Sequence, residues 1–246
     1  MNTIEQKIQA FLSSKNYAKF DLKAVLFDMD GVLYDSMPNH AGSWHTVMNS
    51  YGFDLSFEEA YLHEGRKGLD TIQIVCRRQG VELSDEEIRA IYKKKAELFK
   101  TLPVSKRMPG SYELLQKVQN EGLIPMIVTG SGQKSLLANL SVSFPGIFQQ
   151  ERMVTSFDVK FGKPNPEPYL MALQKGDLKP WEVVVIENAP LGIESAKNAG
   201  LFTIVVNTGP LPDSCLWDAG ANLLYPGMTT LNEEWGTIMK ALYFVD

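Results

Sequence analysis

Two acidic residues separated by one position directly follow the first strand-like run of the sequence. The run is 24–27, and the acids are Asp28 and Asp30, followed by Gly31, which frees the backbone to turn. In an open α/β sheet, ligands bind at the carboxyl ends of the strands. Paired carboxylates there favour a hard cation such as Mg²⁺, and one of them could attack a phosphorus centre while the other moves protons. The spacing alone fits two solvated loop acids equally well.

A second segment, Thr129-Gly130-Ser131-Gly132, has residue types that suit an anion. It follows the apolar run 124–128 and precedes a helical stretch. The hydroxyl of Thr129 and the free amides of Gly130 and Ser131 would therefore face a bound phosphate. A turn that only caps a helix accounts for the same residues.

Two further loops carry a cation and a second polar pair. Lys163 lies in 161–168, where three prolines stiffen the backbone around it. Glu187 and Asn188 end the apolar run 183–186 and precede a helix. Asn188 is either the N-cap of that helix or an oxygen donor to a metal, and a loop lysine such as Lys163 is commonly just solvated.

Lys95 stands on the apolar face of a predicted helix that opens with the capping box at Ser84. It comes seven residues after Ile88, so it projects into the middle of the stripe. A charge on a buried face is costly unless it is paired. Either its stem reaches out to solvent, or the stripe borders an anionic cleft in which Lys95 binds phosphate. The other apolar residues of the stripe are Ile91, Leu98 and Phe99.

The elements that must position these residues follow an α/β pattern. Short apolar runs alternate with helical stretches, which is typical of a parallel sheet with helices on both faces. One helix follows Pro109-Gly110 and stops at Gly122, another follows Pro190 and stops at Gly200, and residues 1–20 predict an N-terminal helix. The predicted strands are 24–27, 124–128, 183–186 and 202–206, with a possible edge strand at 222–224.

One interval of the sequence breaks the alternation. Residues 36–105 contain no strand-like run and are predicted to be entirely helical. We interpret them as a helical cap domain inserted into the core, which then comprises 1–35 and 106–246.

The composition excludes several classes of protein. Among 246 residues, 24 Lys and Arg against 29 Asp and Glu give a net charge of -5, which argues against nucleic-acid binding. Cys76 and Cys215 are too few for a disulfide framework or a structural zinc site. No apolar stretch approaches the roughly 20 residues that span a bilayer, and the N-terminus lacks a secretory signal. We expect a cytoplasmic protein with a small-molecule partner and no membrane partner; its oligomeric state is not indicated.

The four polar segments, taken in order, resemble the haloacid dehalogenase (HAD) superfamily of phosphohydrolases and phosphotransferases. The resemblance covers the whole core and implies a HAD-like Rossmannoid parallel sheet with an inserted helical cap. It implies that Asp28 is the nucleophile that forms an aspartyl-phosphate and that Asp30 is the general acid and base. Thr129 and Lys163 would hold the phosphoryl group, which agrees with the charge neutralisation that phosphoryl transfer demands. The implied ligands of Mg²⁺ are Asp28, Asp30, Glu187 and Asn188.

Within that superfamily the cap and residues 28–36 are similar to the β-phosphoglucomutase and phosphoglycolate phosphatase branch. His40 matches a cap histidine of the mutases, and the resemblance places it on the substrate. Two departures concern the substrate: Asn188 replaces an expected acid, and residues 63–68 do not match the Ser-Arg sugar-phosphate motif of the mutases.

These two departures are interpreted as coupled. Losing one negative ligand weakens the hold on Mg²⁺ unless another oxygen enters, and Glu64 of the cap could supply it. The residues Glu64-Gly65-Arg66 together with Glu187-Asn188 resemble inorganic pyrophosphatase members of the branch, with Arg66 and Lys95 on the substrate. The alternative is that Glu64 is an ordinary surface acid that binds no metal.

Three hypotheses follow from the sequence. The first is a Mg²⁺-dependent phosphohydrolase that acts through an aspartyl-phosphate on a small substrate, with inorganic pyrophosphate favoured. The alternative is a hexose-phosphate mutase of the β-phosphoglucomutase kind. The third is a non-catalytic phosphate-binding protein, for which Asn188 is the only indication.

Overall fold

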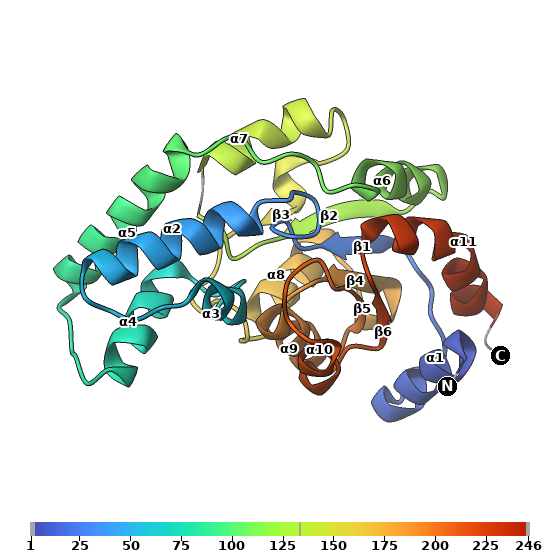
Figure 1. The fold of residues 1–246 in the computed structure, drawn as a ribbon. Helices are drawn as coiled ribbons and strands as arrows, with labels where there is room; N and C mark the ends of the chain where they lie inside the picture. The colour runs from blue at the N-terminus through green and yellow to red at the C-terminus, as the bar shows by residue number, and fades with distance from the viewer. Residues whose placement is uncertain (1–2, 133, 245–246) are drawn as a thin grey trace.

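A six-stranded parallel sheet lies at the centre of the computed structural model, which describes residues 3–132 and 134–244 (Figure 1). The strand order is β3-β2-β1-β4-β5-β6. Its strands are β1 (Ala24–Phe27), β2 (Ile124–Val128), β3 (Met153–Val154), β4 (Val183–Glu187), β5 (Phe202–Val206) and β6 (Leu223–Tyr225). The predicted fold class and all five predicted strands are therefore confirmed, with the edge strand shifted by one residue. The two-residue strand β3 was not predicted.

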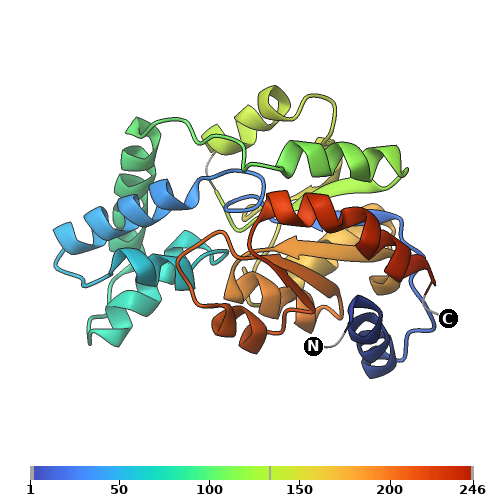
Figure 2. The same cartoon turned by 45° about the vertical axis from the view of Figure 1, so that its right-hand side comes forward.

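Helices cover both faces of this sheet (Figure 2). One face packs on α1 (Ile4–Lys15), α6 (Ser111–Asn120), α7 (Lys134–Ser143) and α11 (Met228–Phe244). The other packs on α8 (Glu167–Gly176) and α9 (Pro190–Asn198), while α10 (Asp213–Ala219) packs beside α9. Burial on both faces explains why the strands are continuously apolar rather than alternating.

Four helices stand apart from the sheet, at the left of Figure 1, and we call them the cap helices. They are α2 (Met37–Ser50), α3 (Phe57–Leu62), α4 (Gly68–Arg78) and α5 (Asp85–Thr101). They share a hydrophobic cluster of their own, and the capping box predicted at Ser84 is present. The division of the chain into 36–105 and the remainder stays a proposal.

The chain passes from the core to the cap helices and back along two neighbouring segments. The amide of Asp35 donates to the Lys106 carbonyl at 2.9 Å, and Asn39 Nδ2 donates to the Pro103 carbonyl at 2.9 Å. These bonds hold the two connecting segments side by side, next to the carboxyl end of β1.

The carboxyl ends of the strands all lie at the edge of the sheet that faces the cap helices, because every strand pair is parallel. The sheet hydrogen bonding continues one residue past two of these ends: the Asp28 amide donates to the Ile186 carbonyl at 3.0 Å and the Thr129 amide to the Val154 carbonyl at 2.9 Å. The polar residues that follow the strands are therefore held by the sheet itself.

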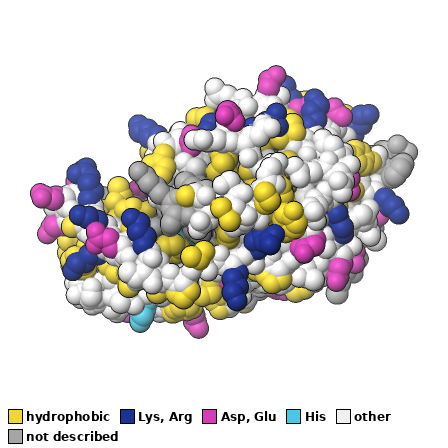
Figure 3. Space-filling model, turned by 90° about the horizontal axis from the view of Figure 1, so that it is seen from above, with side chains coloured by type: hydrophobic (Ala, Val, Ile, Leu, Met, Phe, Trp, Pro, Cys, Tyr) yellow, Lys and Arg dark blue, Asp and Glu magenta, His cyan; other side chains and the backbone are white. Residues whose placement is uncertain are grey.

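Charged side chains of both signs are interspersed on the face shown in Figure 3. The described Lys and Arg residues form no continuous basic surface there, in keeping with the net charge of -5. Within 3–132 and 134–244, no helix combines the length and the apolar character needed to cross a bilayer.

Candidate active site

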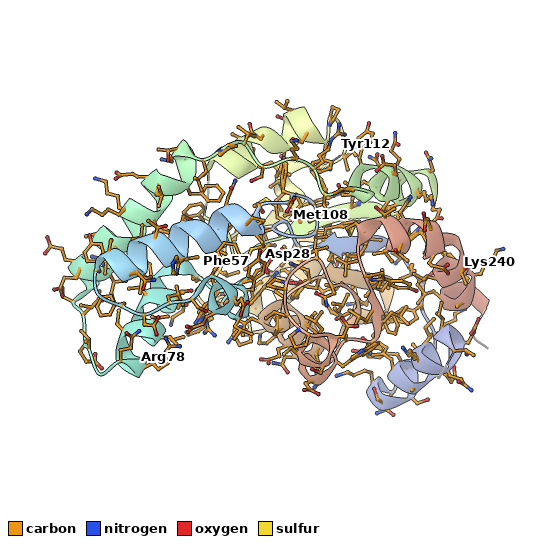
Figure 4. The ribbon with its side chains drawn as sticks, in the orientation of Figure 1. Asp28, Phe57, Arg78, Met108, Tyr112 and Lys240 are labelled. Carbon is orange, nitrogen blue, oxygen red and sulfur yellow. The ribbon has the colours of Figure 1, made fainter. Side chains whose placement is uncertain are left out.

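A small cavity lies between the carboxyl ends of the strands and the cap helices. Figure 4 marks Asp28 at this boundary. The cavity measures about 50 Å³, and the cap helices contribute part of its wall, including Met37, Trp44 and Tyr92. Its polar lining contains nine of the predicted site residues, namely Asp28, Asp30, His40, Glu64, Arg66, Lys95, Thr129, Gly130 and Ser131.

Lys163 connects the nucleophile candidate to the neighbouring strand. Its Nζ lies 2.5 Å from Asp28 Oδ1 and 2.6 Å from Glu187 Oε1, and it donates to the Val128 carbonyl at 3.0 Å. Burial raises the pKa of Asp28 to about 7, against the opposing effect of the Lys163 ammonium. Burial alone would lower the pKa of Lys163, but the two carboxylates hold that pKa above its ordinary value. The rigid position predicted for Lys163 is thus explained by three buried acceptors.

Glu187 has protein donors on both of its carboxylate oxygens. Its Oε1 accepts from Lys163 and from the Tyr169 hydroxyl at 2.9 Å, and its Oε2 accepts from the amides of Asn188 at 2.9 Å and Ala189 at 3.3 Å. A Cβ at Gly192 would lie 1.7 Å from Oε1, so only glycine leaves room for the carboxylate. The structure therefore shows Glu187 as the partner of Lys163, and its predicted role as a metal ligand stays a prediction.

Asp30 begins a chain of buried contacts that reaches into the cap helices. Asp30 Oδ1 accepts from the Ser36 hydroxyl at 2.6 Å and lies 3.3 Å from His40 Nε2, and His40 Nδ1 lies 2.7 Å from Lys95 Nζ. Burial would raise the pKa of Asp30, but His40 and Ser36 hold it below its ordinary value. Burial lowers the pKa of Lys95 to about 7, with Asp30 opposing the shift. Lys95 is 1% exposed, so its stem does not reach solvent.

Asn188 and Glu64 meet across the boundary between the core and the cap helices. Asn188 Nδ2 donates to Glu64 Oε1 at 2.8 Å, and both residues are buried. Helix α9 is capped by Ala189, so Asn188 is not the N-cap that was one alternative from the sequence. Burial, followed by the charge of Asp28, raises the pKa of Glu64 well above its ordinary value. A buried acid in this position is not an ordinary surface acid.

The donor set around Asn188 is suited to a hard cation. Asn188 Oδ1 is buried and accepts no hydrogen bond from the described residues. The carboxylates of Asp28, Asp30 and Glu64 line the same cavity. The described residues contain no ready-made cluster of three or more His, Cys, Asp or Glu side chains, so a cation here would also depend on the Asn188 amide oxygen. Oxygen ligands of this kind fit Mg²⁺.

The predicted phosphate segment lies against the cap at very close range. A Cβ at Gly130 would lie 2.1 Å from the carbonyl oxygen of Gly65. The loop between α3 and α4 (63–67), which we call the cap loop, therefore rests directly on the backbone of Gly130. The amide of Ser131 donates to Thr129 Oγ1 at 2.9 Å, which fixes the hydroxyl at the cavity wall. Arg66 lines the same cavity, and its Nε has no hydrogen-bond partner among the described residues.

The match to a family model agrees with the resemblance that the sequence indicated. The family model for haloacid dehalogenase-like hydrolases matches residues 25–206. The chain belongs to this family. It is therefore an enzyme of the HAD phosphatase and phosphomutase family, as the sequence predicted.

Relatives of this HAD hydrolase include carbohydrate phosphatases. It is 31% identical to the "Phosphorylated carbohydrates phosphatase" of Thermotoga maritima, covering 86% of this chain and 97% of that protein. It is 30% identical to "Hexitol phosphatase A" of Escherichia coli, covering 75% of this chain and 83% of that protein. A solved structure, "Putative beta-phosphoglucomutase from Bacteroides vulgatus", is 58% identical with a TM-score of 0.94, covering 97% of this chain and 98% of that chain.

The structure brings all twelve predicted site residues to one boundary, although their roles stay predictions. Three residues of the site were not predicted from the sequence: Ser36, Tyr169 and Lys67, which contact Asp30, Glu187 and the loop before Lys163, respectively. Tyr169 follows Lys163 by six residues in a helix that opens after prolines, and that spacing was the available signal. Ser36 and Lys67 carried no comparable signal.

Proposed function

We propose that this enzyme is a Mg²⁺-dependent phosphohydrolase that acts through an aspartyl-phosphate at Asp28, with inorganic pyrophosphate as its favoured substrate. The observation that supports this most is the position of Asp28, buried at the cavity with Lys163 Nζ at 2.5 Å from its carboxylate. A carboxylate and a fixed cation at one point are the parts that phosphoryl transfer needs.

The proposed reaction has two steps. In the first, an Asp28 oxygen attacks phosphorus, the bond between phosphorus and the leaving oxygen breaks, and Asp30 donates a proton to that oxygen. Asp30 must gain this proton when the substrate binds, because His40 and Ser36 favour its ionised form in the free enzyme. In the second, Asp30 takes a proton from water as the water oxygen attacks the phosphorus of the aspartyl-phosphate, which releases phosphate and restores Asp28. Thr129 and Lys163 hold the phosphoryl oxygens throughout, and His40 with Ser36 orients Asp30.

The metal proposed for this site would be held by Asp28, Asp30 and Asn188, with Glu64 entering from the cap. Glu187 remains the fifth predicted ligand, although its oxygens already accept four hydrogen bonds. When bound, Mg²⁺ supplies positive charge that offsets the negative charge on the phosphoryl group.

Pyrophosphate is favoured because the cavity is small and charged. Its volume of about 50 Å³ is well below the several hundred Å³ typical of sites for drug-sized ligands. Glu64 of the cap lines this cavity, which leaves less room for a sugar. Lys95 and Arg66 provide further positive groups on the cavity wall for a substrate that carries several negative charges.

The second candidate is a hexose-phosphate mutase or a sugar-phosphate phosphatase. It is favoured by the relatives, which are a phosphatase of phosphorylated carbohydrates, a hexitol phosphatase and a putative β-phosphoglucomutase. A third candidate, a phosphate-binding protein without activity, is weakened because Asp28, Asp30, Thr129 and Lys163 are all present at the site.

A substrate panel tests these functions. Purified protein is incubated with Mg²⁺ and either pyrophosphate, β-glucose 1-phosphate, a hexitol phosphate or phosphoglycolate, and ³¹P NMR follows both phosphate release and isomerisation. We expect pyrophosphate to have the highest kcat/KM. Conversion of glucose 1-phosphate to glucose 6-phosphate with little phosphate release would establish the mutase instead. Binding of phosphate without any turnover would establish the third candidate.

A further inference from the structure

We propose that Lys67 is a positioning residue that clamps the loop carrying Lys163, so that docking of the cap also fixes the position of Lys163. The inference rests on the proposed role of Lys163 in holding the phosphoryl group. Lys67 lies at the N-terminal end of α4, outside the cavity lining described above.

The cap reaches this loop through the Lys67 ammonium. Lys67 Nζ donates to the carbonyl oxygen of Val159 at 3.0 Å and to that of Lys160 at 3.3 Å. Both acceptors are main-chain atoms of the core, more than ninety residues away in the sequence. The contact therefore holds the path of the backbone rather than any single side chain.

The same stretch of backbone is held from its other side by the core. Glu167, in the first turn of α8, accepts from the amide of Lys160 at 2.8 Å and from the amide of Phe161 at 2.8 Å. These amides lower the pKa of Glu167. The loop thus has its amides on a carboxylate of the core and its carbonyls on an ammonium of the cap. Only the second of these two anchors depends on the position of the cap.

Glycines permit the close approach that this clamp requires. A Cβ at Gly162 would lie 2.7 Å from Lys67 Cγ and 3.2 Å from the Lys67 amide nitrogen. A Cβ at Gly65 would lie 2.9 Å from Lys163 Cδ, so the cap loop also rests on the stem of Lys163 itself. Residues 65–67 therefore contact the loop at its middle and at the lysine with which it ends.

The consequence is a coupling between cap and catalytic cation. When the cap is docked, the main chain from 159 to 163 is fixed on both sides, and Lys163 Nζ is held against Asp28. When the cap moves away, the carbonyls of Val159 and Lys160 lose the ammonium, and the loop keeps only its contacts with the core, among them those of Glu167 and of Lys163 Nζ. Fixed geometry at the reacting centre is a large part of the rate in reactions of this type.

Hydrogen exchange tests the clamp without any assumption about the substrate. The wild-type protein, Lys67→Met and Lys67→Arg are compared by the exchange rates of the amides of residues 159–163. We expect Lys67→Met to speed exchange in this segment by about tenfold while the amides of β1 and β4 stay unchanged. Lys67→Arg keeps the donors and should stay within about twofold of wild type.

Pyrophosphate turnover gives the second readout. In single-turnover experiments we expect Lys67→Met to slow cleavage by about tenfold and Lys67→Arg to restore most of the rate. Lys160→Met is the matched control, because it removes an exposed cation from the same loop but keeps the backbone groups of the clamp. It should resemble wild type in both readouts.

Two results would overturn the proposal. One is unchanged exchange in 159–163 for Lys67→Met, and the other is exchange that rises equally throughout the protein. If Lys67→Met does not fold, Gly162→Ala tests the same contact. Exchange of the 159–163 amides at the wild-type rate in that variant contradicts the clamp. Faster local exchange with no pyrophosphate cleavage by wild type would leave the clamp standing and refute the proposed substrate.

Discussion

Asn188 Nδ2 donates to Glu64 Oε1 at 2.8 Å, and this bond joins the end of β4 to the cap loop. A neutral amide at position 188 allows the carboxylate of Glu64 to come this close. An aspartate in its place would put two negative groups together in a buried site, which is unfavourable. The two departures from the branch pattern are therefore in direct contact in the structure.

We predict that the charge of Glu64, not only its shape, is needed for pyrophosphate cleavage. Glu64→Gln keeps an oxygen that can accept from Asn188 but removes one negative charge. We expect kcat/KM for pyrophosphate to fall by about a hundredfold and the Mg²⁺ concentration at half-maximal rate to rise. Magnesium titrations measure both, with the exposed Glu58→Gln as control. Unchanged Mg²⁺ dependence in the variant would remove Glu64 from the metal site.

Replacement of Asp28, the proposed nucleophile, should abolish turnover. Asp28→Asn keeps the size of the side chain but removes the attacking carboxylate, so we expect a loss of at least about a thousandfold in kcat. Mass spectrometry of the acid-quenched wild type should detect the phosphorylated intermediate, and Asp28→Asn should lack it. The exposed Asp21→Asn serves as control. Appreciable hydrolysis by Asp28→Asn would contradict the assignment.

The raised pKa of Asp28 should make the metal-free protein lose stability as the pH rises from 3.8 to about 7. The folded pKa of Asp28 is about 7 and its ordinary value is 3.8, so the folded state holds an extra proton between these values. The stability that this proton gives is present below the ordinary pKa and is lost as the pH rises through about 7. The pKa of Glu64 is also raised in the folded protein, so its effect on stability has the same sign.

Magnesium should reverse this trend, because it favours the ionised carboxylates. We therefore expect Mg²⁺ to raise the melting temperature more at about pH 8 than at about pH 5. Thermal melts with EDTA and with Mg²⁺ at the two pH values measure the difference. An equal gain at both would mean that the cation does not bind at Asp28 or Glu64.

Removal of the Lys95 ammonium should slow the reaction and stabilise the fold. Lys95 touches His40, which lies 3.3 Å from Asp30, so Lys95→Met leaves the His40 ring without the partner that orients it. We expect kcat to fall by about tenfold. Burial lowers the pKa of Lys95 to about 7 from 10.5, so protonation of the folded protein below about pH 7 is costly.

The stability gain from Lys95→Met should therefore be largest below about pH 7 and should shrink as the pH rises toward the ordinary pKa of 10.5. Denaturant unfolding at several pH values checks this, with the exposed Lys93→Met as control. A gain that does not depend on pH would argue against a buried lysine that titrates.

A methyl group at Gly130 should push the cap away from the site. Its Cβ would lie 2.1 Å from the Gly65 carbonyl oxygen, and backbone atoms on both sides leave little freedom to adjust. For Gly130→Ala we expect about a tenfold loss of kcat/KM with little change in thermal stability. Steady-state kinetics of Gly130→Ala measure this loss. The control is Gly227→Ala, because a Cβ at Gly227 meets no atom within 4 Å. Wild-type kinetics in Gly130→Ala would show that the cap need not approach this closely.

The sequence was most informative where a residue's role depends on its neighbours along the chain. Continuous apolar runs identified five strands, and Asp28 and Thr129 were found because each directly follows one of them. The edge strand β3 was missed because two residues carry no pattern. Glu187 was expected at a metal, but Lys163 approaches it through a tertiary contact that no spacing reveals. The spacing of Tyr169 from Lys163 was a signal for Tyr169 itself, but it did not point to Glu187. Lys67 was missed for the same reason, since its partners are main-chain carbonyls.

The paired connecting segments at Asp35 and Lys106 also bear on how such enzymes diversify. The bonds that join them, at 2.9 Å each, tie the entry and the exit of the inserted helices together beside the central strand. Whatever is spliced between these two points begins and ends at one spot, and the sheet need not be cut or reordered to receive it. Changes between these two points can thus reshape the cap side of the cavity while the residues that follow the strands keep their positions.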